Sequence, residues 1–259
     1  WMQNYCRCHA TPLHIADLVA ADLTTLNIAG SGSLTLTANT LGGATTTAIT
    51  NTSTGAVTLG GTLAAGTTYT GGVGVDTITL GASTKAITTG EGNDVVGVTA
   101  ALGTGGTVDG GAGTNTLKMT GTLAATLDDS IAFSTAVSNF SRLELTDGAT
   151  VNLTNIDSIN YVTLSGGGTS SLSGAANGAT LVINAASVSS TVALAADGSA
   201  DTLNVVLTNA ASTNYGTVVA TTFENVALTA TESGTLSTDA TVIDTATATL
   251  DDATAKTIT

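Results

Sequence analysis

Aspartate and glycine recur together at a fixed spacing between residues 71 and 117, and both supply oxygen ligands for a hard cation. The first copy is Gly71-Gly72-Val73-Gly74-Val75-Asp76-Thr77-Ile78-Thr79, and the second, Thr89-Gly90-Glu91-Gly92-Asn93-Asp94-Val95-Val96, follows 18 residues later. A third copy, Gly110-Gly111-Ala112-Gly113-Thr114-Asn115-Thr116-Leu117, has Asn115 in place of the carboxylate. Ca²⁺ accepts about six to eight oxygens from carboxylates and backbone carbonyls. The pattern therefore predicts a calcium site.

The spacing of these copies predicts that their turns stack on one edge of a coil. In a β-roll, two nine-residue units complete one coil of about 18 residues, so positions 18 apart face the same side. Glycine permits backbone conformations that turn carbonyl oxygens inward, which a Cβ would obstruct. The eighth positions, Ile78, Val96 and Leu117, are apolar because they point into a narrow core. The candidate metal ligands of the three turns are Gly71, Gly72, Gly74, Asp76, Gly90, Gly92, Asn93, Asp94, Asp109, Gly111, Gly113 and Asn115.

The unit between the first two copies, residues 81–87, predicts an opposite edge without ions. It keeps the inward apolar residue Ile87 but places Lys85 where the ligand aspartate belongs. The third copy stands 21 residues after the second, so it contains a short insertion. There Asn115 can offer a carbonyl oxygen, and Asp109 lies just upstream as a substitute carboxylate. The alternative for all three copies is a glycine-rich turn series without metal.

A further acidic turn lies in the second half of the chain. The run Asp197-Gly198-Ser199-Ala200-Asp201-Thr202-Leu203 places Asp201 and Leu203 at the spacing of the sixth and eighth positions. Asp197 and Asp201 are therefore candidate metal ligands of another ion-linked turn. An acidic surface loop is the alternative.

The composition favours thin coils over a compact globular core. Only 9% of residues are charged and 3% aromatic, and the chain holds 31 glycines. A solenoid fills its interior with Ala, Val, Ile and Leu. Alternations such as Leu34-Thr35-Leu36-Thr37 and Leu203-Asn204-Val205-Val206 predict strands with one buried face. Strand signals at intervals of about 8–12 residues fit a solenoid or a sandwich, and the nonapeptide register selects an all-β parallel β-solenoid, or β-roll.

A weaker repeat supports the same architecture. Four segments, 23–28, 140–145, 159–164 and 223–228, each place apolar residues at their first, fourth and sixth positions. Such a unit buries little alone but extends a continuous core when it is stacked on its neighbours. We expect little helix, in short pieces around residues 12–21 and 129–137.

The first 14 residues differ in composition from the rest of the chain. They hold both cysteines, both histidines, the only tryptophan and the only proline, so we expect residues 1–14 to be a vector-derived or non-native leader. Cys6, Cys8, His9 and His14 are too compressed for the usual zinc spacing. We expect residues 15–259 to form the solenoid, with the calcium-binding segment at 70–120.

The charge balance excludes some partners. Asp and Glu number 19 against 5 Lys and Arg, a formal charge of −14, and no basic stripe is present for phosphate contacts, so we expect no nucleic-acid partner. No stretch reaches the roughly 20 apolar residues that span a bilayer, so we expect no transmembrane segment. Excess carboxylates repel one another in a compact state, and divalent cations relieve that repulsion.

Three stretches resemble the calcium-dependent S-layer lattice proteins of caulobacter-type bacteria, which carry RTX β-roll repeats. They are Ile15-Ala16-Asp17-Leu18-Val19-Ala20-Ala21-Asp22-Leu23-Thr24-Thr25-Leu26-Asn27-Ile28, the segment from Thr70 to Ile87, and Phe223-Glu224-Asn225-Val226. The resemblance covers about residues 13–259, and the 70–117 block is its most specific part. It implies a right-handed β-solenoid from within a larger secreted structural protein, which self-associates with Ca²⁺ into a two-dimensional lattice on the cell surface. Anchoring and type I export would belong to missing regions of that parent.

Two other classes of function stay open. β-Roll repeats also accompany secreted hydrolases, such as lipases, esterases, proteases or glycan-active enzymes. However, the chain has no H-E-x-x-H and no G-x-S-x-G motif, which favours a protein without catalysis. An adhesin module is the third class, but the tyrosines Tyr69, Tyr161 and Tyr215 are isolated and form no platform for sugar stacking.

Overall fold

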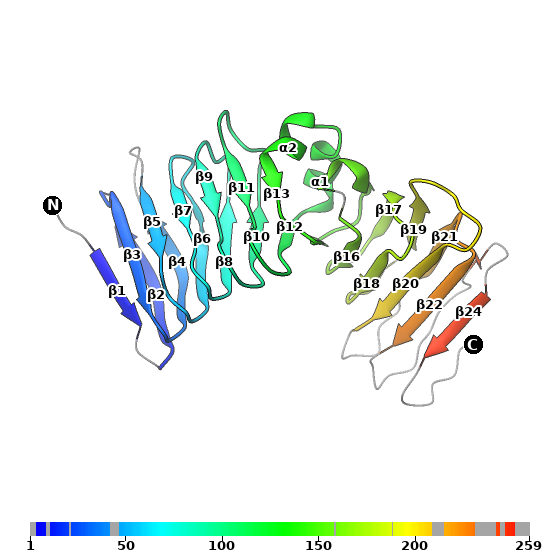
Figure 1. The fold of residues 1–259 in the computed structure, drawn as a ribbon, viewed down its shortest axis with the longest axis horizontal. Helices are drawn as coiled ribbons and strands as arrows, with labels where there is room; N and C mark the ends of the chain where they lie inside the picture. Colours follow the sequence, from blue (N-terminus) through cyan, green and yellow to red (C-terminus); the bar gives the residue numbers. More distant parts are fainter. Residues whose placement is uncertain are drawn as a thin grey trace. The chain divides into compact units, whose positions relative to one another are not determined.

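The computed structural model describes residues 4–8, 11–20, 22–41, 47–157, 159–187, 189–208, 215–230, 242–243 and 247–251. They form an all-β, right-handed parallel β-solenoid of about 10 turns with little helix, as predicted (Figure 1). The chain divides into two compact units, residues 1–118 with 132–141, and residues 119–131 with 142–259.

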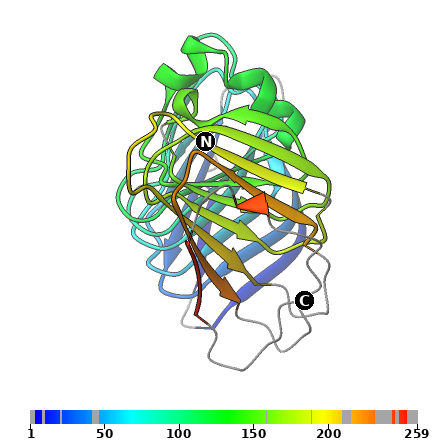
Figure 2. The same cartoon turned by 90° about the vertical axis from the view of Figure 1, so that its right-hand side faces the viewer.

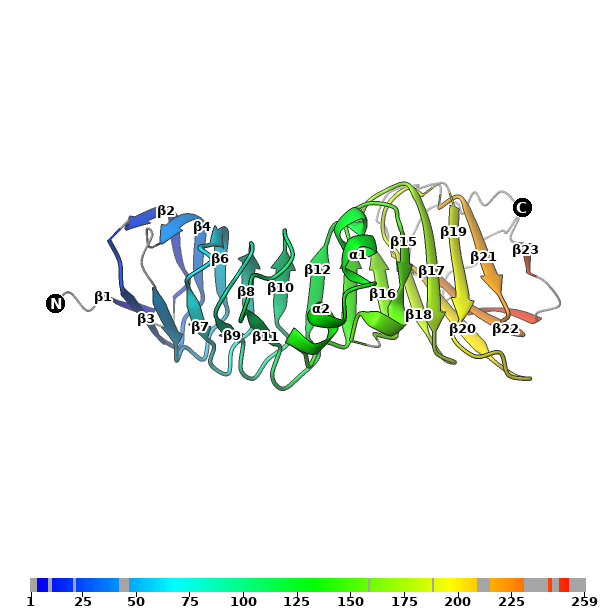
Figure 3. The ribbon, with the colours of Figure 1, turned by 90° about the horizontal axis from the view of Figure 1, so that it is seen from above.

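In the first unit, successive strands alternate between two parallel sheets (Figure 3). One sheet has the order β1 (Asn4–Cys8), β3 (Thr25–Gly30), β5 (Ala48–Asn51), β7 (Thr68–Thr70), β9 (Ala86–Thr88), β11 (Thr107–Asp109) and β13 (Val137–Ser138). The other has the order β2 (Leu13–Ala20), β4 (Leu34–Leu41), β6 (Val57–Leu63), β8 (Asp76–Leu80), β10 (Val95–Val98) and β12 (Thr116–Met119). Seen from the end, these coils lie one behind another (Figure 2).

The core of the first unit consists of columns of aliphatic side chains. The eighth positions of the nonapeptides, Ile78, Val96 and Leu117, are buried, and their neighbours in β8, β10 and β12 alternate between buried and partly exposed. Register joins them directly, because Ile78 pairs with Val96 and Val96 with Leu117. Full burial of one such side chain stabilises the fold by about 1.5–3 kcal/mol, so each coil depends on the next.

The second unit repeats the parallel arrangement with different strand lengths. One sheet contains β14 (Arg142–Leu145), β16 (Tyr161–Leu164), β18 (Thr180–Ile183), β20 (Thr202–Leu207), β22 (Asn225–Ala230) and β24 (Thr247–Asp251). The other contains β15 (Thr150–Asn152), β17 (Thr169–Ala175), β19 (Ser189–Leu194), β21 (Thr217–Thr221) and β23 (Val242–Ile243). A short 3-10 helix, η1 (Leu153–Asn155), follows β15.

The helices differ in part from the sequence-based expectation. The expected helix at 12–21 is wrong, because Leu13–Ala20 is strand β2 and pairs in parallel with β4. The expectation at 129–137 is close to α2 (Ile131–Ala136). Helix α1 (Gly121–Leu127) was not expected, and its N-terminus is capped by the Thr120 side chain, which accepts from Leu123 N at 3.1 Å.

The backbone of the N-terminal segment takes part in the sheet. Strand β1 pairs in register with β3, from Asn4 with Leu26 to Cys8 with Gly30. The prediction of a non-native leader over residues 1–14 stays a prediction, and His9 lies outside the described residues.

Candidate metal centre

The sixth positions of the three nonapeptide copies form one column in the first unit. Strand register pairs Thr77 with Val95 and Val95 with Thr116, so the preceding residues Asp76, Asp94 and Asn115 lie on successive coils. All three side chains are 0% exposed. The spacing of the copies has therefore brought two carboxylates and an amide together inside the solenoid.

Each side chain of this column accepts a hydrogen bond from the coil before it. The Asp76 N–H donates to Asp94 Oδ1 at 2.8 Å, and the Asp94 N–H donates to Asn115 Oδ1 at 3.0 Å. Asp76 Oδ1 accepts from Asn51 Nδ2 at 2.8 Å. The remaining oxygens, Asp76 Oδ2 and Asp94 Oδ2, are buried and have no hydrogen-bond partner. A buried carboxylate oxygen without a partner is costly unless a cation or a proton neutralises it.

Burial makes both carboxylates hard to ionise. The pKa of Asp76 is raised to about 7, chiefly by burial, with a further contribution from the charge of Asp94. The Tyr69 hydroxyl and the Asn51 amide oppose this rise, and no basic side chain does so. Burial also raises the pKa of Asp94. The pair thus lacks a countercharge, which is the electrostatic setting that a divalent cation satisfies.

The glycines of the first two turns leave room beside these carboxylates. A Cβ on Gly71 would lie 2.4 Å from Asp76 Oδ2 and 1.9 Å from the carbonyl oxygen of Thr89. A carboxylate oxygen and a backbone carbonyl oxygen of the next coil therefore converge on a space that only glycine keeps open. In the second turn, Gly90 and Gly92 have φ of +94° and +132°, which glycine adopts readily. These residues fit a hard, oxygen-seeking cation.

In the third turn, the predicted ligands make hydrogen bonds within the chain. Asn115 Nδ2 donates to the carbonyl oxygens of Gly111 at 3.3 Å and Asn139 at 3.0 Å. Asp109 Oδ1, predicted as a substitute ligand, accepts from Gly111 N at 2.8 Å and Asn139 Nδ2 at 2.7 Å. Asn93 Oδ1 accepts from Thr114 N at 2.8 Å. The amide group of Asn115 thus contacts the carbonyl oxygens that a cation would otherwise contact.

The remaining turn glycines lie against the backbone of the neighbouring coil. The opposite edge of the coil carries a lysine instead of an aspartate. Glu91 N donates to Gly72 O at 2.7 Å, and Ala112 N donates to Gly90 O at 2.8 Å. A Cβ on Gly113 would lie 1.8 Å from Gly92 O, and one on Gly74 would lie 2.3 Å from Gly55 O. Lys85, which precedes β9 in the other sheet, is exposed.

A second acidic cluster lies in the second unit. Carboxylate oxygens of Asp197, Asp201 and Glu224 lie within 4.8 Å of one another. The Asp201 N–H donates to Glu224 Oε2 at 2.7 Å, and Gly198 N donates to Asp201 Oδ2 at 2.5 Å. Sequence reasoning missed Glu224. The available signal was its place directly before β22, one coil after Asp201, which directly precedes β20.

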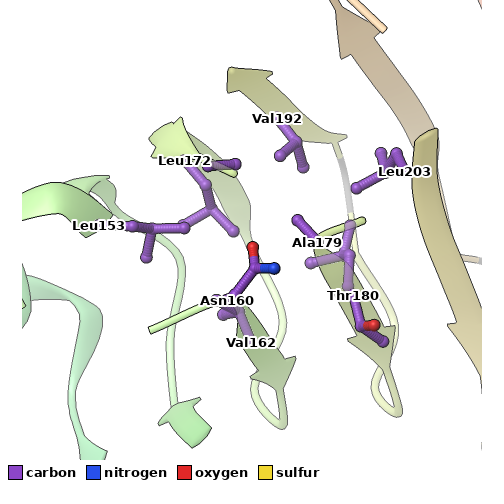
Figure 4. A pocket seen from close by; sticks show the side chains of 10 residues that line it. Leu153, Asn160, Val162, Leu172, Ala179, Thr180, Val192 and Leu203 are labelled. Atoms are coloured by element: carbon purple, nitrogen blue, oxygen red, sulfur yellow. The ribbon is translucent and has the colours of Figure 1, made fainter. Parts of the chain in front are cut away.

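A small pocket inside the second unit does not add a site. It is lined mainly by aliphatic side chains, including Leu153, Leu172 and Val192, with the Asn160 amide among them (Figure 4). Asn160 Oδ1 is buried without a hydrogen-bond partner. A single polar atom on an aliphatic wall does not fix the orientation of a polar ligand.

No protein-family model matches this sequence, and no curated protein matches it. The fold is compatible with a β-roll repeat protein. Within the part of the chain that the structure describes, no helix is both long and apolar enough to cross a membrane.

Proposed function

We propose that this chain is a calcium-stabilised structural β-solenoid of the RTX type, which self-associates into an S-layer-like lattice outside the cell. The observation that carries the proposal is the pair Asp76 and Asp94, two fully buried carboxylates on adjacent coils, each with one unpartnered oxygen. They lie at turns whose glycines bring carbonyl oxygens close by.

The types of oxygen donor at this site favour Ca²⁺ over the transition metals. Carboxylate and carbonyl oxygens without nitrogen or sulfur donors suit Ca²⁺ better than the transition metals. We assign the ion to the first two turns, with Asp76 and Asp94 supplying the charge. The third turn needs no ion, because the Asn115 amide already donates to its carbonyl oxygens.

A structural rather than catalytic role agrees with the rest of the chain. Thin parallel coils present long, regular, Thr-rich faces, and the net charge of −14 keeps separate copies apart until cations bridge or neutralise them. A structural solenoid and its resemblance to lattice proteins together support secretion and assembly at the cell surface.

Calcium titration followed by calorimetry and by light scattering tests the proposal. We expect saturable Ca²⁺ binding, absent for Mg²⁺ at the same concentration, and growth of sheet-like assemblies that electron microscopy resolves and chelation reverses. Ca²⁺ binding without assembly would overturn the proposed lattice function, but the proposed calcium site would stand. The absence of both would overturn the proposal as a whole.

A further inference from the structure

One carboxylate oxygen in the candidate metal centre receives its hydrogen bond from an exceptional donor. At the second and third turns, the side-chain Oδ1 of the sixth position accepts from the backbone N–H of the equivalent residue one coil earlier. Asp76 N donates to Asp94 Oδ1 at 2.8 Å, and Asp94 N donates to Asn115 Oδ1 at 3.0 Å. Asp76 Oδ1 instead accepts from a side chain, the amide of Asn51, at 2.8 Å. The first turn therefore depends on a side chain where the later turns use the backbone.

The preceding coil cannot supply the backbone donor that the later coils supply. Strand register pairs Asp76 with Val57, so Val57 occupies the equivalent place one coil earlier. The Val57 N–H already donates to the carbonyl oxygen of Val75 at 2.8 Å, and the apolar Val57 side chain is fully buried. Without another donor, Asp76 Oδ1 would be a buried carboxylate oxygen without a partner, which is costly. Asn51 supplies that donor.

The Asn51 amide is held in the orientation that this contact requires. Asn51 is the last residue of β5, and its side chain is 1% exposed. The Ser53 N–H donates to Asn51 Oδ1 at 2.8 Å, so the amide oxygen is occupied and the amide nitrogen faces Asp76. Both ends of the amide group are therefore fixed.

A fixed Oδ1 determines where the other oxygen of Asp76 lies. Asp76 Oδ2 has no hydrogen-bond partner and lies at the Gly71 turn, where a Cβ on Gly71 would clash with it and with the carbonyl oxygen of Thr89. Rotation of the carboxylate would move Oδ2 away from this carbonyl oxygen. Groups that hydrogen-bond to a metal ligand orient it, and their loss typically lowers metal affinity about 10- to 100-fold.

We propose that Asn51 is a positioning residue of the calcium site, which holds Asp76 Oδ1 so that Oδ2 is presented to the ion at the Gly71 turn. The inference rests on the proposed function, because it needs an ion beside Asp76. It extends the site beyond the nonapeptide copies, since Asn51 lies one coil before the first of them.

Calcium titration calorimetry on the full chain tests the inference with Asn51→Leu, which keeps the size of the side chain and removes the amide. An aliphatic side chain suits this column, because the register neighbour of Asn51 one coil earlier is the buried Ile28. We expect the Ca²⁺ affinity to fall about tenfold or more. The loss falls on the ion-bound state, because only a bound ion requires Asp76 to keep one orientation.

The Asp76→Asn background separates positioning from support of the fold. In this background the carboxylate that Asn51 holds is absent, so adding Asn51→Leu should change the remaining Ca²⁺ affinity less than about twofold. A residue that only supported the fold would lower the affinity by the same factor in both backgrounds.

Thr47→Val is the matched control, at the residue directly before the same strand. The Thr47 side chain is buried, and its hydroxyl donates one hydrogen bond, to the carbonyl oxygen of Leu23 at 2.8 Å. Thr47→Val removes that bond and keeps the shape of the side chain. It should therefore lower the melting temperature measured with chelator and leave the Ca²⁺ affinity unchanged.

The outcomes separate the two proposals. If Asn51→Leu keeps the Ca²⁺ affinity, raises it or lowers it equally in both backgrounds, Asn51 does not position Asp76, and the calcium site stands without it. If Asn51→Leu does not fold, Asn51→Ala takes its place, with a smaller expected loss because water can enter the vacated space. If the unchanged chain does not bind Ca²⁺, the proposed function and this inference are both overturned.

Discussion

The two acidic sites of this molecule share a backbone pattern but differ in what their carboxylates contact. In both, an aspartate beside the start of a strand donates its N–H to an acidic side chain one coil further on, Asp76 to Asp94 and Asp201 to Glu224. Asp76 and Asp94 are sealed from solvent and keep unpartnered oxygens. In the other cluster Asp197 is exposed and Glu224 is partly exposed, whereas Asp201 is buried and its Oδ2 accepts a backbone hydrogen bond.

On the proposed function, burial without a hydrogen-bond partner, rather than the density of acidic residues, distinguishes the cation site. Solvent and mobile ions screen an exposed carboxylate such as Asp197, so we expect the second cluster to depend less on a bound ion; its role as an ion-linked turn stays a prediction. A sealed pair must bind a proton or a cation. The following predictions test that contrast, from the largest expected effect to the smallest.

Chelation should destabilise the first unit far more than the second. Ca²⁺ at about 1,000 times its Kd stabilises a folded site by about 4 kcal/mol, which corresponds to roughly 8–16 °C in a chain of this size. Calorimetry with and without chelator measures the shift, and hydrogen exchange locates it. Loss of protection should concentrate in residues 70–120. An equal loss of hydrogen-exchange protection around residue 201 would contradict the predicted difference between the two sites.

Neutralising one carboxylate in each site should sharpen the contrast further. Asp76→Asn should weaken Ca²⁺ binding about 100-fold, about 2.7 kcal/mol, because it removes a buried charge from the site. Asp201→Asn is the matched control and should change the affinity less than about twofold. Asn115→Ala should fall between them. With chelator, Asp76→Asn should instead raise the melting temperature, because it removes an unpaired buried charge. Equal calcium affinities for the two aspartate variants would contradict this assignment.

Adding a methyl group at one turn glycine of each site should destabilise the two sites by different amounts, because the added Cβ meets different atoms. In Gly71→Ala the Cβ would meet a backbone carbonyl of the next coil at 1.9 Å, whereas in Gly198→Ala it would meet the Asp201 carboxylate at 2.7 Å. The backbone carbonyl of Thr89, directly after β9, cannot move aside as a side chain can. Gly71→Ala should therefore cost about 1–3 kcal/mol and Gly198→Ala less, as measured by denaturant unfolding. A larger cost for Gly198→Ala would contradict the close packing at Gly71.

The pH dependence of stability gives the smallest effect. Without calcium, the folded state binds a proton at Asp76 more tightly than the unfolded state, since burial raises its pKa to about 7. Stability should therefore be greatest at low pH and fall by a few degrees as the pH rises through about 7. Saturating Ca²⁺ should remove this decline, because the ion replaces the proton. Melting curves with chelator that do not change between about pH 5 and pH 8 would contradict it.

The sequence predicted the fold and the column of turns because both follow from local periodicity. Copies 18 residues apart return to the same edge when a coil holds two nine-residue units, and register places Asp94 directly after Asp76. The buried apolar positions follow from the same alternation. The helix expected at 12–21 failed because its short apolar spacing also fits a strand, and pairing with β4 decided between the two.

Residues outside the periodic copies could not be predicted in the same way. Asn51 and Asp76 are 25 residues apart, because the coil between them has a different length from the nonapeptide coils. Tyr69 lies in the other sheet from Asp76, and its influence on the pKa of Asp76 is not encoded by any local pattern. Glu224 joins Asp201 only through the register of β20 with β22. In each case the contact depends on coil length, which is set by tertiary packing.

The amide of Asn115 has a consequence for how repeats of this kind diverge. On the proposed function, its two N–H groups contact carbonyl oxygens like those that an ion contacts in the first two turns. Asparagine and aspartate codons differ by a single base. One point mutation can therefore change a coil that is stable without an ion into a coil that requires one. On the proposed function, a lineage in calcium-poor water could shed its ion requirement one repeat at a time, with the architecture intact at every step.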